Sequence, residues 1–122
     1  MKRINIGLLG CGTVGGGLVD LLRDNRDLVA RRSGLDLHLQ KVLVQDPKKE
    51  RPCTPELITT SPESILEDPS IDVVVELIGG LTPARPLLLE AIRSGKNVVT
   101  ANKALLAGHG REIFDHALDQ QV

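Results

Sequence analysis

The sequence predicts an α/β protein with a doubly wound parallel sheet of the Rossmann type, and three observations support this prediction. A glycine-rich turn at residues 10–15 follows an apolar run and opens a helical pattern. Strand-like and helical patterns then alternate along the chain, which favours right-handed crossovers between parallel strands. The strand-like runs include β-branched, almost continuously apolar segments, as in strands covered on both faces. We therefore expect one domain over residues 1–122.

The first expected strand is the apolar run at residues 4–9, and three spaced glycines follow it in the pattern of a dinucleotide-binding turn. Gly10 can adopt backbone angles that are closed to residues with a Cβ, so the chain can reverse within a few residues. Gly12 leaves room for a pyrophosphate against bare backbone, and Gly15 lets the next helix pack close to the strand. The phosphates would meet unpaired N–H groups at the positive end of that helix. A purely structural tight turn is the alternative interpretation.

A single long helix is expected after the glycines, reaching about as far as Arg32. Apolar residues such as Val14, Leu18 and Leu21 fall mostly at helical spacing, with charged residues on the other side. Gly34 suits the left-handed turn in which many helices end, so it predicts the helix terminus.

The later elements continue the alternation of strands and helices. In chain order we expect a strand at residues 35–44, a polar loop at 45–52, a short helix at 61–66, a strand at 71–78, a helix from Thr82 to Gly95, a strand at 97–100, and a last helical pattern carrying Ile113, Phe114, Ala117 and Leu118. The stretch 54–60 contains few apolar residues, and no element is expected there.

The carboxyl ends of the expected strands carry the candidate binding residues. Ligands of doubly wound sheets bind outside these ends. The segments in question are residues 10–15, Gln45 with Asp46, Gly79 with Gly80, and residues 100–103. The sequence therefore predicts one crevice to which four separated stretches contribute.

Composition excludes several classes of function. A net charge of -1 gives no basic footprint for nucleic acid, and 1% aromatic residues leave no platform for stacking bases. The hydrophobic content of 41% is that of an ordinary globular protein without a membrane span. Cys11 and Cys53, like the scattered His38, His109 and His116, lack metal-ligand spacing, so no metal is expected. Because no signal peptide precedes the first strand, we expect a cytoplasmic protein.

The loop after the second strand leaves the cofactor open between NAD and NADP. An acid at this point, here Asp46, accepts a hydrogen bond from the ribose 2′-hydroxyl of NAD. Basic side chains, here Lys48, Lys49 and Arg51, accommodate the 2′-phosphate of NADP. Both signals are present, and a solvated charged loop is the alternative interpretation.

Two charged residues at later strand ends are candidates for a role in the crevice. Lys103 follows the fourth expected strand, where its ammonium could hold a substrate oxygen or contact the cofactor. An ordinary surface lysine in the first turn of a helix is the alternative. Glu76 ends a buried apolar strand, so backbone N–H groups of a neighbouring loop should satisfy its carboxylate in a structural role.

Three motifs resemble the nucleotide-binding domain of homoserine dehydrogenases: GCGTVG at residues 10–15, VELIGG at 75–80 and VVTANKALLA at 98–107. The resemblance spans essentially the whole chain. It implies an NAD(P)-dependent enzyme that exchanges hydride between NAD(P)H and aspartate semialdehyde or homoserine, in the biosynthesis of threonine, isoleucine and methionine. It also implies a small-molecule substrate and a homo-oligomer for the full-length protein.

The resemblance further implies roles for individual residues. Thr13 and Val14 would line the cofactor beside the glycines. Thr100, Asn102 and Lys103 would lie at the nicotinamide, with Lys103 in the active site as a catalytic residue.

Two features depart from the family pattern. Gln45 stands where the family often has an arginine that can hold the 2′-phosphate, so NAD and NADP both remain open. The family's substrate domain, with its catalytic Lys and Asp, follows the nucleotide domain and is absent here, so we expect a fragment that is inactive alone. Alternatives are the nucleotide domain of another NAD(P)-dependent dehydrogenase and a non-catalytic dinucleotide-sensing module.

Overall fold

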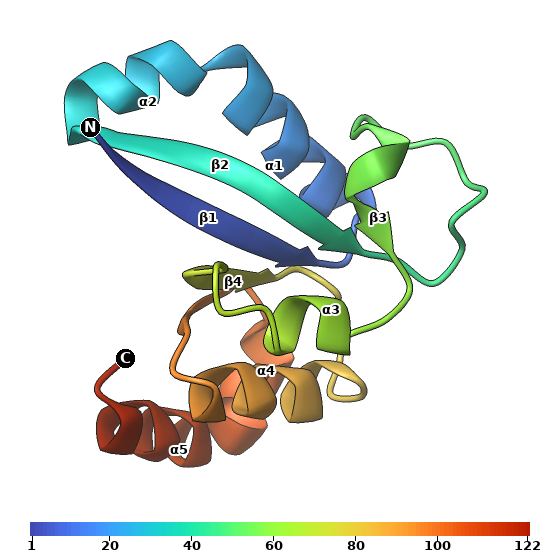
Figure 1. Cartoon of the computed structure of the whole chain (residues 1–122). Coiled ribbons are helices and arrows are strands. Elements are labelled where there is room, and N and C mark those ends of the chain that lie inside the picture. Colours follow the sequence, from blue (N-terminus) through green and yellow to red (C-terminus); the bar gives the residue numbers. More distant parts are fainter.

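The computed structural model describes residues 1–122 and contains one five-stranded sheet in the order β3-β2-β1-β4-β5 (Figure 1). Its strands are β1 (Lys2–Leu9), β2 (Leu35–Leu43), β3 (Ile58–Thr59), β4 (Val73–Glu76) and β5 (Asn97–Thr100). Every neighbouring pair is parallel. The expected doubly wound α/β fold of the Rossmann type is therefore confirmed.

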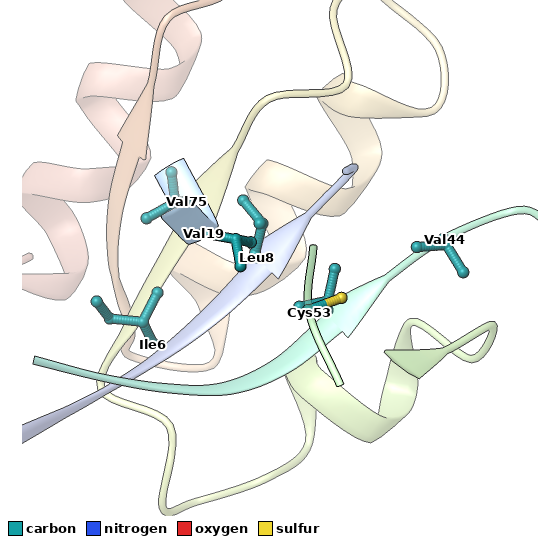
Figure 2. Packing of buried hydrophobic residues seen from close by; sticks show 7 residues of the cluster. Ile6, Leu8, Val19, Val44, Cys53 and Val75 are labelled. Atoms are coloured by element: carbon teal, nitrogen blue, oxygen red, sulfur yellow. The ribbon is translucent and has the colours of Figure 1, made fainter. Parts of the chain in front are cut away.

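Helices cover both faces of the sheet (Figure 1). They are α1 (Thr13–Asp24) and α2 (Arg26–Ser33) on one side, with α3 (Glu63–Leu66), α4 (Ala84–Arg93) and α5 (Lys103–Gln120) on the other. Because successive strand residues point to opposite faces, β1 contributes to two cores. Leu8 packs with Val19 of α1 (Figure 2), and Leu9 packs with Ile65 and Ala91 on the opposite side. Both cores thus fix the strand that ends in the glycine turn.

The carboxyl ends of four strands form one row. Leu9 of β1 pairs with Leu43 of β2 and with Glu76 of β4, and Glu76 pairs in turn with Thr100 of β5. The chain leaves this row at each strand end and enters the stretches that the sequence marks as candidate binding segments. Their expected convergence on one edge of the sheet is confirmed.

The expected single helix up to Arg32 is wrong, because the chain breaks it at Asn25 into α1 and α2. Asn25 has φ -116° and ψ 17°, and its side-chain Nδ2 donates to the carbonyl oxygen of Leu21 at 3.3 Å. Short amide side chains compete with the backbone for hydrogen bonds in this way, which disfavours continued helix. The apolar pattern was also partly misleading, since Val14 and Leu21 are exposed.

The stretch 54–60, where no element was expected, contains a short 3₁₀ turn (Pro55–Leu57) and strand β3. Ile58 and Thr59 pair with Val42 and Leu43 at the edge of the sheet. A strand of two residues is too short to show alternation in the sequence. The other expected elements are present, and Gly34 ends α2 in the left-handed conformation with φ 74°.

The last helical pattern is confirmed as α5, although only part of its apolar set is covered. Ile113 is buried, whereas Phe114 and Leu118 are exposed. None of the helices is sufficiently long and apolar to cross a membrane.

Candidate functional site

A cleft of about 500 Å³ opens at the carboxyl edge of the sheet. It is lined by Gly10, Cys11, Gly12, Leu43, Val44, Gln45, Lys49, Arg51, Thr60, Pro62, Leu77, Ile78, Pro83 and Leu87. These residues come from the glycine turn, from the segments that follow β2, β3 and β4, and from helix α4. The cleft therefore lies where ligands of doubly wound sheets bind.

The glycine turn has the geometry expected for close approach of a ligand to the backbone. Gly10 has φ 93°, a left-handed conformation that side chains with a Cβ rarely adopt. A Cβ on Gly15 would collide with the carbonyl oxygen of Gly10, so α1 can start this close to β1 only because Gly15 has no side chain. A Cβ on Gly12 would meet no protein atom within 4 Å. The space beside Gly12 is thus open on the cleft side.

Helix α1 presents an uncapped N-terminus next to Gly12. The residue before the helix is Gly12, no side chain caps the first turn, and no acidic residue lies in that turn. The N–H groups at the start of a helix have no intrahelical partner and carry the positive end of the macrodipole. Thr13 and Val14 begin the helix and are both exposed. This arrangement fits a pyrophosphate, which accepts hydrogen bonds and carries negative charge.

The acidic residue of the loop after β2, Asp46, is hydrogen-bonded within its own turn. The Oδ1 atom of Asp46 accepts from the backbone N–H of Lys48 at 2.9 Å, and Asp46 is not among the lining residues. Arg51 lines the cleft and donates from one terminal nitrogen to the carbonyl oxygens of Asp46 and Lys49. Its Nε atom is buried and has no hydrogen-bond partner. The charged lining residues, Lys49 and Arg51, are both basic.

Cys11 places a thiol in the glycine turn at the wall of the cleft. Burial raises the pKa of this thiol, and the neighbouring Cys53 raises it further through its charge and through a hydrogen bond between the side chains. A raised pKa keeps the thiol protonated and poorly nucleophilic near neutral pH. Cys11 therefore has the character of a small packing residue.

Glu76 is fully buried at the end of β4, and both of its carboxylate oxygens are hydrogen-bonded. Oε2 accepts from the backbone N–H groups of Ile78 at 2.8 Å and Gly79 at 3.1 Å. Oε1 accepts from the hydroxyl of Thr100 at 2.6 Å. The expectation that loop N–H groups satisfy this carboxylate is confirmed, and the contact to Thr100 adds a link that the sequence did not indicate.

The link continues from Thr100 to the start of α5. Thr100 Oγ1 accepts from the backbone N–H of Asn102 at 3.0 Å. Asn102 is buried, its Oδ1 accepts from the N–H of Leu105 at 3.1 Å, and its Nδ2 donates to the carbonyl oxygen of Gly80. The side chain of Asn102 is thus occupied as the N-cap of α5. Lys103 is the first residue of that helix and is exposed.

The structure brings the sequence-predicted residues to one edge of the sheet but places only some of them in the cleft. Gly10 and Gly12 line it, whereas Thr13, Val14, Gly15, Asp46, Gly79, Thr100, Asn102 and Lys103 do not. Sequence reasoning missed Thr60, Pro62 and Leu87, which also line it. Thr60 and Pro62 reach the cleft because β3 adds a strand beside β2. Recognising Ile58 and Thr59 as an edge strand would have found them.

A family model described as "Homoserine dehydrogenase, NAD binding domain" matches residues 10–122. The chain belongs to this family. The motif resemblance seen in the sequence is confirmed, and so is the expected cofactor class of NAD or NADP.

Two homoserine dehydrogenases are similar to this chain along its whole length. The homoserine dehydrogenase of Pseudomonas aeruginosa is 46% identical over 124 residues, covering 100% of this chain and 28% of that protein. The crystal structure of a homoserine dehydrogenase from Thiobacillus denitrificans superimposes with a TM-score of 0.93 at 48% identity, covering 100% of this chain and 28% of that one. The chain thus spans 28% of the length of these relatives.

A more distant structure extends the fold comparison. A hyperthermophilic archaeal homoserine dehydrogenase in complex with NADPH matches with a TM-score of 0.75 at 18% identity, covering 99% of this chain and 42% of that one. At this identity the match shows a common fold.

Proposed function

We propose that this chain is the dinucleotide-binding part of a homoserine dehydrogenase and that it binds NADP(H) or NAD(H) across the carboxyl edge of the sheet. The observation that carries the proposal is the uncapped start of α1 beside Gly12, where a Cβ would meet no protein atom within 4 Å. A pyrophosphate at this place would receive the first-turn N–H groups of α1. The family match supports the same ligand class.

The full-length protein would exchange hydride between the cofactor and aspartate semialdehyde or homoserine, a step in threonine, isoleucine and methionine biosynthesis. When bound, the nicotinamide ring supplies or accepts the hydride. The role of this chain is to bind and orient. Gly12 and the start of α1 hold the phosphates. Lys103, exposed at the start of α5, would face the small-molecule substrate as a catalytic residue, and we propose a homo-oligomer for the complete protein.

Of the two cofactors, we propose NADP as the preferred one. Asp46, the residue that would accept from the ribose 2′-hydroxyl of NAD, is held in its own turn by the N–H of Lys48. Lys49 and Arg51 supply positive charge to the cleft wall. The negative charge of a 2′-phosphate would be attracted to these two basic side chains.

Calorimetric titration of the purified chain with NADPH and NADH tests cofactor binding. The Gly12→Ala variant should fold normally and weaken binding of both cofactors by about tenfold or more, because its methyl group fills the space of the pyrophosphate. Gly17→Ala is the matched control, since Gly17 lies in α1, the helix that follows Gly12, is exposed, and has no atom near its Cβ position. Absence of binding to the unmodified chain at millimolar cofactor would overturn the proposal.

The role of Lys103 is tested in the full-length protein. Lys103→Ala should reduce kcat for aspartate semialdehyde by about a hundredfold or more, which is the usual size of effect for a residue at the reacting centre. Lys2→Ala is the control, because Lys2 is also exposed but begins β1 at the opposite edge of the sheet. Equal activity of the two variants would make Lys103 an ordinary surface lysine.

A further inference from the structure

Glu76 is an ionisable side chain that no proposed step of the reaction uses, although it is 0% exposed. Its neighbours along β4 include Val74 and Val75, both buried. Burial of a carboxylate in such surroundings is unfavourable unless its oxygens are hydrogen-bonded. Glu76 meets this condition with three donors from two different segments: Ile78 N, Gly79 N and Thr100 Oγ1.

Two segments meet at Glu76 on the carboxyl edge of the sheet: the turn that follows β4 and the end of β5. On one side, Gly79 and Gly80 follow β4 with φ values of 84° and 69°, so they form a turn that only glycine adopts readily. On the other side, Thr100 is the last residue of β5 and lies directly opposite Glu76 in the sheet. A side chain at this register position can reach both the turn and the neighbouring strand.

The hydrogen bonds form a closed circuit between these segments. From Glu76 it passes through the hydroxyl of Thr100 to the N–H of Asn102. From Asn102 the circuit returns to the turn after β4, because Asn102 Nδ2 donates to the carbonyl oxygen of Gly80. The preceding residue, Gly79, donates its N–H to Glu76. The same Asn102 side chain caps α5 at Leu105. Hydrogen bonds thus link the carboxylate of Glu76 to the first turn of α5.

We infer that Glu76 is a positioning residue, whose buried carboxylate ties the Gly79–Gly80 turn to the start of α5 and so fixes the place of Lys103. This inference rests on the proposed function, in which Lys103 faces the substrate. Displacement of a reacting group by about 1 Å can cost about a hundredfold in rate, so a network that fixes such a group bears on catalysis without touching the substrate.

Two substitutions at Glu76 separate positioning from folding. Glu76→Leu removes all three hydrogen bonds but keeps a buried side chain of similar size, and it should lower stability because the donors of Ile78, Gly79 and Thr100 lose their acceptor. Glu76→Gln keeps one oxygen for the N–H groups of Ile78 and Gly79. Its amide nitrogen cannot accept from the Thr100 hydroxyl, so only the hydrogen bond to β5 is lost as it stands. Val74→Ala is the control, because Val74 is 0% exposed on the same strand and lies outside the network.

Amide hydrogen exchange in the 122-residue chain tests the network without any assay of activity. In Glu76→Leu the amides of Ile78, Gly79, Asn102 and Leu105 should exchange about tenfold faster than in the unmodified chain, relative to amides of α1. In Glu76→Gln only the amides of Asn102 and Leu105 should exchange faster. Uniformly faster amide exchange, as expected in Val74→Ala, or unchanged exchange would overturn the inference. If Glu76→Leu does not fold, Glu76→Gln provides the same test.

Kinetics of the full-length protein then test the consequence. We expect kcat to fall about tenfold in Glu76→Gln while KM for the dinucleotide changes less than about threefold, because the phosphates are held at α1 and not at α5. Val74→Ala should keep the kcat of the unmodified protein at a temperature where it is folded. Equal kcat in Glu76→Gln and the unmodified protein would overturn the inference. A chain that shows the exchange pattern but binds no dinucleotide would contradict the proposed function alone.

Discussion

Gly15 at the start of α1 lies against the carbonyl group of Gly10 at the end of β1, so closely that a Cβ on Gly15 would collide with the oxygen and lie 3.1 Å from the carbon. This contact sets the distance between the strand and the helix whose N-terminus faces the cleft. The two glycines therefore have different roles. Gly10 allows the turn with φ 93°, and Gly15 allows α1 to approach the turn after β1 closely.

Gly15→Ala should destabilise the fold by about 1–3 kcal/mol, the usual cost of overpacking a close contact. Gly17→Ala, two residues further along α1, should instead stabilise by up to about 1 kcal/mol, because it replaces glycine by alanine in an open helix position. Urea denaturation of both variants measures the difference. Similar stability of the two would mean that the turn relaxes without the Gly10–Gly15 contact.

Arg51→Met should weaken binding of NADPH by about tenfold and leave binding of NADH within about twofold, because only NADPH carries a 2′-phosphate for the guanidinium. Asp46→Asn is the companion variant, since the Asp46 carboxylate accepts from Lys48 N and Asp46 is not among the residues that line the cleft. It should leave the affinity for NADH within about twofold, as expected for a group that contributes no bond to the ribose. A selective loss of NADH binding in Asp46→Asn would show that this carboxylate, not Arg51, reads the ribose.

Cys11 should react slowly with thiol reagents near neutral pH and faster as the pH rises, because burial and the neighbouring Cys53 raise its pKa and the thiolate is the reactive form. Saturating dinucleotide should slow the reaction further, since Cys11 lines the cleft. Mass spectrometry after iodoacetamide treatment at several pH values measures both effects. A Cys11→Ser variant identifies labelling that comes from Cys53, and rapid modification of Cys11 at neutral pH would contradict the expected shift.

The stabilisation that the Asp68 carboxylate gives the fold should be lost in acid. This carboxylate accepts from the hydroxyl and N–H of Ser70 and lies 3.3 Å from Lys41 Nζ, and these contacts lower its pKa from the usual 3.8 to about 2. Between these values the unfolded chain binds the proton more readily than the folded chain, so the stabilisation is present above about pH 4 and lost as the pH falls towards 2.

Urea denaturation of the unmodified chain and of Asp68→Asn across this range measures the effect of Asp68. The difference in unfolding free energy should be largest at neutral pH and should shrink between about pH 4 and about pH 2. A difference that stays constant with pH would show that the Asp68 contacts do not depend on its charge.

Local sequence signals predicted the parts of the fold that depend on neighbouring residues. The glycines of the turn, the ends of α2 and α4 at Gly34 and Gly95, and the buried strand β4 all follow from residue type and spacing. The break at Asn25 did not follow, because an asparagine is tolerated within many helices and its competing bond to Leu21 depends on local geometry. Strand β3 exists only through its pairing with β2, which no local pattern encodes.

In the candidate site, too, contacts within one segment could be predicted and contacts between segments could not. The bonds from Glu76 to the loop N–H groups could be predicted, because a buried carboxylate at a strand end has few other partners nearby. Its bond to Thr100 could not, since it depends on the register between β4 and β5. For Asp46, residue type indicated a possible ribose contact, and it did not indicate the hydrogen bond that Asp46 accepts from Lys48 N within its own turn.

The most direct measurement of the central claim is an NMR titration of the isotopically labelled chain with NADPH. Binding in the proposed place should shift the amide signals of Gly12, Thr13 and Val14 at the start of α1, together with those of Thr100 and Lys103 across the edge of the sheet. The same titration of Gly12→Ala should lose these shifts while keeping a folded spectrum. Unchanged spectra at millimolar NADPH, or shifts confined to the opposite edge around Asp72 and Gly95, would contradict the account.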